Sequence, residues 1–237
     1  MLIVDNLKVK IGKKKILQGL TLKVDRGEVV VLVGPNASGK SSLAKTLMGF
    51  EEYEITGGEI KFKDKLLNGK MIEDRVKMGM VISWQNSPTI KGVSLRKLIN
   101  KTAKKKIKTE EFGISENLLK RDLNRGFSGG EKKLSELMQV VSLKPSLVIL
   151  DEIDAGLDVK KIKQMIKIIK TKLVDNGVGV LIITHQEEVL RLLKPKRVLI
   201  MVRGKIICES KNYQKIWRVI DKYGYEKCKK CRLLADR

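Results

Sequence analysis

Nine residues, GPNASGKSS at positions 34–42, constrain the fold of this chain more than any other feature. They match the pattern G-x-x-x-x-G-K-[ST] and follow directly after an apolar run, EVVVLV. The next segment, SSLAKTLMGF, has helical spacing, with Leu43, Leu47 and Phe50 on one face. Such a turn between a strand and a helix directs backbone N–H groups inward, and the helix N-terminus adds partial positive charge. The segment therefore predicts a phosphate-binding loop.

The residue types in this loop match the parts of a bound nucleotide. Lys40 has the reach to contact the β and γ phosphates, and the Ser41 hydroxyl is placed to coordinate Mg²⁺. The alternative for such a string is a glycine-rich turn that holds no ligand. We expect nucleotide contacts from the whole loop, which comprises Gly34, Pro35, Asn36, Ala37, Ser38, Gly39, Lys40, Ser41 and Ser42.

The rest of the chain predicts an α/β domain built on a parallel sheet. The runs SLVIL (146–150) and VGVLIITH (178–185) are almost wholly apolar, as is typical of strands buried on both faces. Between them lies an apolar helix face with a lysine-rich opposite face, and strand, helix, strand in this order indicates parallel pairing. The first 33 residues alternate and predict further strands, whereas the lysine-rich region from about 85 to 126 predicts short helices with loops.

Composition argues against several classes of protein. No apolar run approaches the about 20 residues needed to cross a bilayer, and the start MLIVDNLKVK lacks the layout of a secretory signal. We therefore expect a cytoplasmic protein with no membrane segment of its own. The formal net charge is +23, but aromatic residues are only 4% and the lysines are spread along the chain, so no direct nucleic-acid role is expected. An acidic protein partner would be attracted equally well.

Three cysteines, Cys208, Cys228 and Cys231, are too few for a disulfide framework, which fits a reducing compartment. The pair in CKKC is half of a zinc or cluster site, and the chain has no second pair and no nearby histidine to complete it. We expect two free thiols at Cys228 and Cys231. A metal shared with a partner is the alternative.

Four carboxylates gather in the stretch DEIDAGLD at positions 151–158. Asp151 ends a predicted central strand, where a carboxylate lies beside the phosphate loop and can hold Mg²⁺ directly or through water. Glu152 comes next and would face the γ-phosphate, where a carboxylate can orient or deprotonate the attacking water. Capping of a following helix is the alternative for this pair.

His185 is the only histidine, and it ends the other predicted central strand. Because parallel strands finish at the same edge of a sheet, His185 should lie near the γ-phosphate. A purely structural histidine is the alternative.

The segment FSGGEKK (127–133) predicts a second anion site. Ser128, Gly129 and Gly130 stand at the N-terminus of an amphipathic helix, where a hydroxyl, bare backbone and the helix dipole combine. One nucleotide has one γ-phosphate, which the first loop already holds. The second site should therefore serve the nucleotide of another subunit.

The order of these motifs along the chain resembles that of the ABC-type ATPase domain, and the resemblance covers essentially the whole sequence. It implies a P-loop NTPase-type parallel sheet flanked by helices, with an antiparallel β-subdomain. It also implies a single domain over residues 1–237, with a helical subdomain inserted at about 86–140. Two such domains would pair head to tail in a transient, ATP-dependent homodimer, and the 128–130 loop of each would act on the partner's ATP.

The resemblance also implies roles for individual residues, with ATP and Mg²⁺ as the cofactors. Gln85 resembles the residue that reaches Mg²⁺ and the attacking water, and Asp158 the one that signals across the dimer. Glu152, His185 and Gln85 would then be catalytic. Mg²⁺ would be held by Ser41, Gln85 and Asp151.

Within the family, FSGGEKK, DEIDAGLD, GMVISWQNSPTIKGVS and the late YGY resemble the ATPase subunits of Suf systems. These soluble ATPases drive iron–sulfur cluster assembly on a scaffold, which implies a SufB/SufD-like scaffold protein as the partner. Transport ATPases usually read LSGGQ and DEPTSALD instead. The ATP-binding subunit of a membrane ABC transporter, with a separate permease, is the alternative function.

Three positions depart from the common family pattern. Ala37 and Ser42 replace the usual Gly and Thr, and both are small enough to keep the loop active. Ile11 stands where many members place a tyrosine that stacks on adenine. We expect weak recognition of the base, which leaves the selectivity among nucleotides open.

Overall fold

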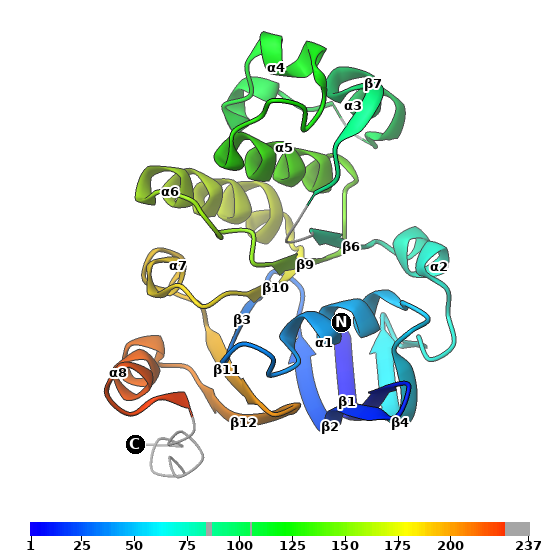
Figure 1. Ribbon diagram of the computed structural model, residues 1–237, viewed down its shortest axis with the longest axis vertical. Helices are drawn as coiled ribbons and strands as arrows, with labels where there is room; N and C mark the ends of the chain where they lie inside the picture. Colours follow the sequence, from blue (N-terminus) through cyan, green and yellow to red (C-terminus); the bar gives the residue numbers. More distant parts are fainter. Residues whose placement is uncertain (84–86, 105, 226–237) are drawn as a thin grey trace.

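The computed structural model describes residues 1–83, 87–104 and 106–225, and its central feature is a six-stranded sheet (Figure 1). The strand order is β12-β11-β3-β10-β9-β6, and all neighbours are parallel except β11 and β12. The strands are β3 (Val29–Val33), β6 (Met80–Ser83), β9 (Leu147–Asp151), β10 (Gly179–Ile183), β11 (Arg197–Val202) and β12 (Lys205–Ser210). The predicted α/β class with a parallel sheet is confirmed.

A second, antiparallel sheet lies beside the first and has the order β2-β1-β4-β5. Its strands are β1 (Leu2–Ile11), β2 (Lys14–Val24), β4 (Glu54–Phe62) and β5 (Lys65–Leu66). The alternation of apolar and polar residues near the N-terminus produces this sheet, because one face of each strand is buried and the other is solvated.

Helices cover both faces of the central sheet (Figure 1). Helix α1 lies between the two sheets, whereas α5 to α8 pack on the opposite face. The helices are α1 (Lys40–Met48), α2 (Ile72–Lys77), α3 (Leu95–Thr102), α4 (Glu116–Lys120), α5 (Gly129–Ser142), α6 (Val159–Ile168), α7 (Glu187–Leu193) and α8 (Tyr213–Tyr223). Three short helical segments lie between these helices and strands: η1 (Thr109–Phe112), η2 (Ile169–Leu173, a π-helical continuation of α6) and η3 (Val174–Asn176).

The central sheet separates two hydrophobic cores. Successive side chains of β3 point to opposite faces, so Val29, Val31 and Val33 join the core under α5 to α8, and Val30 and Leu32 join the core around α1. Both faces are buried, which explains why the central strands have continuous apolar runs.

Several short elements were not predicted from the sequence. They are the helices α2 and α7, the strand β5, and the small pair β7 (Ile90–Ser94) and β8 (Asp122–Leu123). Each spans seven residues or fewer, which is too short for hydrophobic periodicity to distinguish it from a loop.

Arg75, on α2, is only 2% exposed and binds the C-terminal end of α1. Its guanidinium donates to the carbonyl oxygens of Thr46 and Leu47, both at 2.9 Å, and to those of Leu67 and Lys70, at 2.8 and 3.0 Å. Burial lowers the pKa of Arg75 to about 10, so the side chain stays charged at neutral pH. The guanidinium therefore satisfies terminal carbonyls of the helix that begins at the phosphate loop.

Among the described residues, no helix combines the length and the apolar character that a membrane span requires.

Candidate active site

Three parallel strands bring the predicted site residues to one edge of the central sheet. Ile183 of β10 pairs with Leu32 of β3 on one side and with Asp151 of β9 on the other. The segments that leave these strand ends carry the phosphate loop, Glu152 and His185. The register alone therefore places all three next to one another.

The phosphate loop encloses a cavity of about 200 Å³. It runs into α1, whose N-cap is Gly39 in the left-handed conformation, with φ 105°. The first turn of α1 has no side-chain cap among the described residues, and its residues Lys40, Ser41 and Ser42 line the cavity, as in an anion site at a helix N-terminus. The cavity is lined by Asn36, Ala37, Gly39, Lys40, Ser41, Ser42 and Glu152.

Two positions of the loop have strict backbone requirements. A Cβ at Gly34 would lie 2.1 Å from the carbonyl oxygen of Met201, so only glycine fits there. Ala37 has φ 60°, in the left-handed region where a Cβ is strained. Glycine would adopt this conformation without strain, and this chain tolerates the small cost of alanine.

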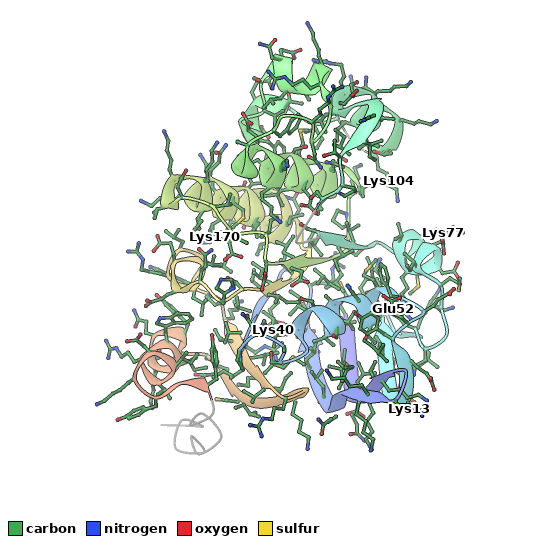
Figure 2. All side chains as sticks on the ribbon, viewed as in Figure 1. Lys13, Lys40, Glu52, Lys77, Lys104 and Lys170 are labelled. Carbon is green, nitrogen blue, oxygen red and sulfur yellow. The ribbon has the colours of Figure 1, made fainter. Side chains whose placement is uncertain are left out.

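Lys40 lies at the start of α1, next to the edge of the sheet (Figure 2). Its side chain is buried, and its Nζ donates to the carbonyl oxygens of Gly34 and Pro35, both at 2.9 Å. Burial lowers the pKa of Lys40, and the nearby Glu152 and Asp151 oppose that shift. The ammonium is thus held by neutral carbonyls, which a phosphate oxygen can replace as a stronger acceptor.

Asp151 presents a buried carboxylate beside the loop and is 5% exposed. Burial raises its pKa, and a hydrogen bond with the Ser41 side chain acts against the rise. Its Oδ1 atom has no hydrogen-bond partner within the part of the chain that the structure describes. A buried oxygen ligand with unused acceptor capacity next to a hydroxyl is suited to a divalent cation.

Glu152 adopts a strained backbone conformation, with φ 49°. Its N–H donates to the carbonyl oxygen of Ile183 at 3.0 Å, which fixes the turn against β10. Such left-handed non-glycine residues cost about 1–3 kcal/mol and cluster at active sites. The predicted alternative for Asp151 and Glu152, capping of a helix, is wrong, because α6 begins at Val159 with Asp158 as its N-cap.

His185 and Glu152 face each other across the ends of two strands. His185 Nδ1 lies 3.7 Å from Glu152 Oε1, and the side chains are 51% and 15% exposed. The histidine is therefore accessible from solvent, unlike a residue that serves only the packing of the core.

Ser128 caps its own helix. Its Oγ accepts from the N–H of Glu131 at 3.3 Å, and its N–H donates to Glu131 Oε2 at 2.8 Å, which together form a capping box at α5. Gly129 and Gly130 form the first turn of this helix. Residues 128–130 are not among the described residues that line the phosphate-loop cavity.

The capping box predicts a pH dependence of stability. The hydrogen bond from the Ser128 backbone lowers the pKa of Glu131 below its usual 4.5. A lowered pKa in the folded state stabilises the fold above pH 4.5, and this contribution is lost as the pH falls through the folded value. We expect urea unfolding to show a smaller loss of stability below pH 4.5 for Glu131→Gln than for the parent chain. An equal loss in both proteins would contradict it.

Asp158, predicted to signal across a dimer, has a structural task as well. Its Oδ1 accepts from the N–H of Lys161 at 2.8 Å as the N-cap of α6. Asp158→Ala should lower the free energy of unfolding by about 1 kcal/mol, whereas Asp158→Asn keeps the cap. If Asp158 also signals through its charge, ATP turnover should fall in both variants. Turnover that falls only in the alanine variant would assign the residue to capping alone.

Three predicted residues, Gln85, Cys228 and Cys231, lie outside the described residues. Across the described ranges, no group of three or more His, Cys, Asp or Glu side chains is arranged to hold a metal ion.

Lys133 lies near the carboxylates of the site and was not predicted from the sequence. It is buried on α5, and burial lowers its pKa while carboxylates, Glu136 foremost and then Asp154, Asp151 and Glu152, counteract the shift. Lys133 follows another lysine, Lys132, which is only half-buried, and the sequence gives no signal that separates the two.

A larger cleft, of about 610 Å³, lies between α3, α4 and the segment around residues 103–110. Its lining includes four basic residues, Arg96, Lys104, Lys106 and Lys108, and two acidic ones, Glu110 and Glu116. Figure 2 places Lys104 far from Lys40, so this basic cleft is separate from the phosphate loop.

Comparison with known proteins supports the resemblance found in the sequence. The family model described as ABC transporter matches residues 17–155. The chain is 37% identical over 227 residues to the probable ATP-dependent transporter SufC of Escherichia coli, covering 87% of this chain and 91% of the relative. It is 36% identical to ABC transporter I family member 6, chloroplastic, of Arabidopsis thaliana, covering 91% of this chain and 68% of the relative.

Solved structures agree on the fold. The ADP conformation of an ATP-binding cassette from an ABC transporter matches with a TM-score of 0.78 and 24% identity, covering 98% of this chain and 99% of that one. A dimeric post-hydrolysis state of another cassette, bound to ADP and Pi, matches with a TM-score of 0.71 and 20% identity, covering 89% and 98%. The chain therefore belongs to the ATP-binding cassette (ABC) ATPase family, and it is an ATP hydrolase.

Proposed function

We propose that this chain is the Mg²⁺-dependent ATPase subunit that drives iron–sulfur cluster assembly on a SufB/SufD-like scaffold. One observation carries the proposal: the similarity to SufC extends over most of both chains. The stretches FSGGEKK and DEIDAGLD, which differ from the usual transporter motifs, support it. We further propose one domain over residues 1–237, with a helical subdomain at about 86–140.

The residues at the phosphate loop fit a magnesium ion. Ser41 and Asp151 would hold it, supported by the hydroxyl beside the buried carboxylate and the unused Oδ1 of Asp151. Gln85 would join them by its resemblance to the family residue. When bound, Mg²⁺ neutralises charge on the β and γ phosphates.

We infer a mechanism of in-line attack by water on the γ-phosphate. Glu152, which lines the phosphate cavity, orients the water and takes its proton. His185 stands beside it and stabilises the charge that develops on the transferred group. The Lys40 ammonium exchanges its hydrogen bonds to the carbonyl oxygens of Gly34 and Pro35 for hydrogen bonds to phosphate oxygens. Ser128 of the partner subunit completes the site.

The composite site requires two chains, so ATP turnover per subunit should rise with protein concentration. The supporting feature is that residues 128–130 lie outside the lining of their own chain's phosphate cavity. Phosphate release would be measured across a wide dilution series without scaffold. A rate per subunit that stays constant over the series would contradict the head-to-tail dimer.

Co-purification tests the partner. The chain would be expressed with a SufB-like scaffold and, separately, incubated with membrane fractions, and each sample would be separated by size. We expect the chain to follow the scaffold. Stable association with a membrane permease and none with the scaffold would favour the alternative, the ATP-binding subunit of a transporter.

The nucleotide preference is a separate question for the same protein. Ile11 ends β1, and its aliphatic side chain offers no aromatic ring for the base to stack on. We propose that selectivity among ATP and other nucleoside triphosphates is weak.

A further inference from the structure

Asp154 is the one carboxylate of the 151–158 stretch that the shared ATPase chemistry leaves without a task. It is 1% exposed, and burial raises its pKa, with the hydrogen bond from Thr184 as the main opposing influence. A carboxyl group is expensive to bury, and here Oδ2 has a hydrogen-bond partner, whereas Oδ1 has none among the described residues.

The carboxylate and the backbone carbonyl of Asp154 are hydrogen-bonded to the two neighbours of His185. The Thr184 hydroxyl donates to Asp154 Oδ2 at 2.6 Å, and Gln186 Nε2 donates to the Asp154 carbonyl oxygen at 3.0 Å. Thr184 Oγ1 in turn accepts from the Gln186 N–H at 3.0 Å. Asp154, Thr184 and Gln186 thus form a closed ring of hydrogen bonds, and the backbone of His185 lies inside the segment that the ring fixes.

The same residue also holds the turn that leads to Asp158. The carbonyl oxygen of Asp154 accepts from the Leu157 N–H at 3.2 Å, in addition to the bond from Gln186. The Thr184 N–H donates to the carbonyl oxygen of Leu32 at 3.3 Å, next to the start of the phosphate loop. Asp154 and its partner Thr184 together therefore join three segments: the end of β3, the loop after β10 and the turn between β9 and α6.

We propose that Asp154 is a positioning residue, which holds the His185 loop against the Glu152 turn and so sets the position of the His185 side chain at the γ-phosphate. This inference rests on the proposed roles of Glu152 and His185. Glu152 follows β9 and His185 lies two residues after the end of β10, and the Glu152 N–H donates to the carbonyl oxygen of Ile183, the last residue of β10. The hydrogen bonds among Asp154, Thr184 and Gln186 form a second attachment of the His185 loop, next to the bond between Glu152 and Ile183. With two attachments the loop keeps one orientation relative to the Glu152 turn.

The clearest test removes the Thr184 hydroxyl without changing the volume of this fully buried side chain. Thr184→Val should lower kcat by roughly 10- to 100-fold, as expected when a reacting group is displaced by about 1 Å. The KM for ATP should change by less than about two-fold, because none of the three ring residues lines the phosphate cavity. Thr184→Ser keeps the hydroxyl and should restore most of the rate.

A double-mutant cycle shows whether the effect acts through the histidine. In a His185→Ala background, Thr184→Val should reduce kcat by no more than about two-fold further. Ser142→Ala is the matched control, since it removes another buried hydroxyl, which donates to the Gln139 carbonyl oxygen at 2.7 Å at the end of α5. It should lower the unfolding temperature without changing kcat.

Several outcomes would overturn the proposal. The proposal is wrong if Thr184→Val lowers only the unfolding temperature and leaves kcat unchanged, or if it reduces kcat by the same factor with and without His185. If Thr184→Val does not fold, Gln186→Met, at a half-buried position, removes the bond to the Asp154 carbonyl and must show the same pattern. A wild-type rate for His185→Ala alone would contradict the role proposed for that histidine, and with it the positioning of Asp154. Failure of the Thr184 cycle alone would leave the role of His185 intact.

Discussion

Glu152→Gln should lower kcat for ATP hydrolysis by roughly 100- to 1,000-fold while the protein still binds ATP. The amide is nearly the same size as the carboxylate, so the strained turn and the bond to Ile183 are retained. It cannot accept the proton of the attacking water, which is the task proposed for Glu152. Steady-state phosphate release gives kcat, and equilibrium binding of a fluorescent ATP analogue gives the affinity.

Glu73→Gln is the matched control, because it makes the same chemical change at an exposed position on α2. It should hydrolyse ATP at the parent rate. Hydrolysis by Glu152→Gln at that same rate would remove the proposed base from the mechanism.

Arg75→Met should lower the free energy of unfolding by roughly 3–5 kcal/mol. Methionine fills much of the space but donates no hydrogen bonds, so four carbonyl oxygens lose the guanidinium that serves them. Gly49, the C-cap of α1, packs so closely on Arg75 that a Cβ there would lie 2.8 Å from Nε. Urea denaturation gives the change in stability.

Arg218→Met, on the exposed side of α8, is the control and should change stability by less than about 0.5 kcal/mol. If Arg75→Met unfolds at the same urea concentration as the control, the anchoring of α1 by Arg75 is wrong. The expected loss also matters for function, because α1 carries the phosphate loop at its other end.

Much of the fold is predictable from hydrophobic periodicity. The two-fold alternation at the N-terminus and the apolar runs at β9 and β10 identify strands, since burial on one or both faces leaves a direct pattern in the sequence. The helices α2 and α7 escape prediction because they are short. The role of Arg75 escapes it too, because a buried arginine that binds carbonyls from residues 46 to 70 has no local signature.

The site is predictable where its chemistry follows from position at a strand end. Asp151 pairs with Ile183 at the end of β10, His185 follows that strand, and the loop that leads to Lys40 follows β3 at the same edge. The φ of Glu152 and the bonds of Asp154 are not predictable, because they depend on contacts between segments about 30 residues apart. The sequence does mark Asp154 as an acidic residue without a role, and the structure shows what binds it.

The most direct test of the proposed function measures ATP turnover with and without a scaffold. Purified chain would be assayed alone, with a SufB/SufD-like scaffold complex, and with membranes that contain a permease, at one fixed protein concentration. The proposed function requires that the scaffold raises kcat per subunit and that Glu152→Gln abolishes the increase without preventing scaffold binding. Turnover that is unchanged by the scaffold but raised by the membranes would contradict it.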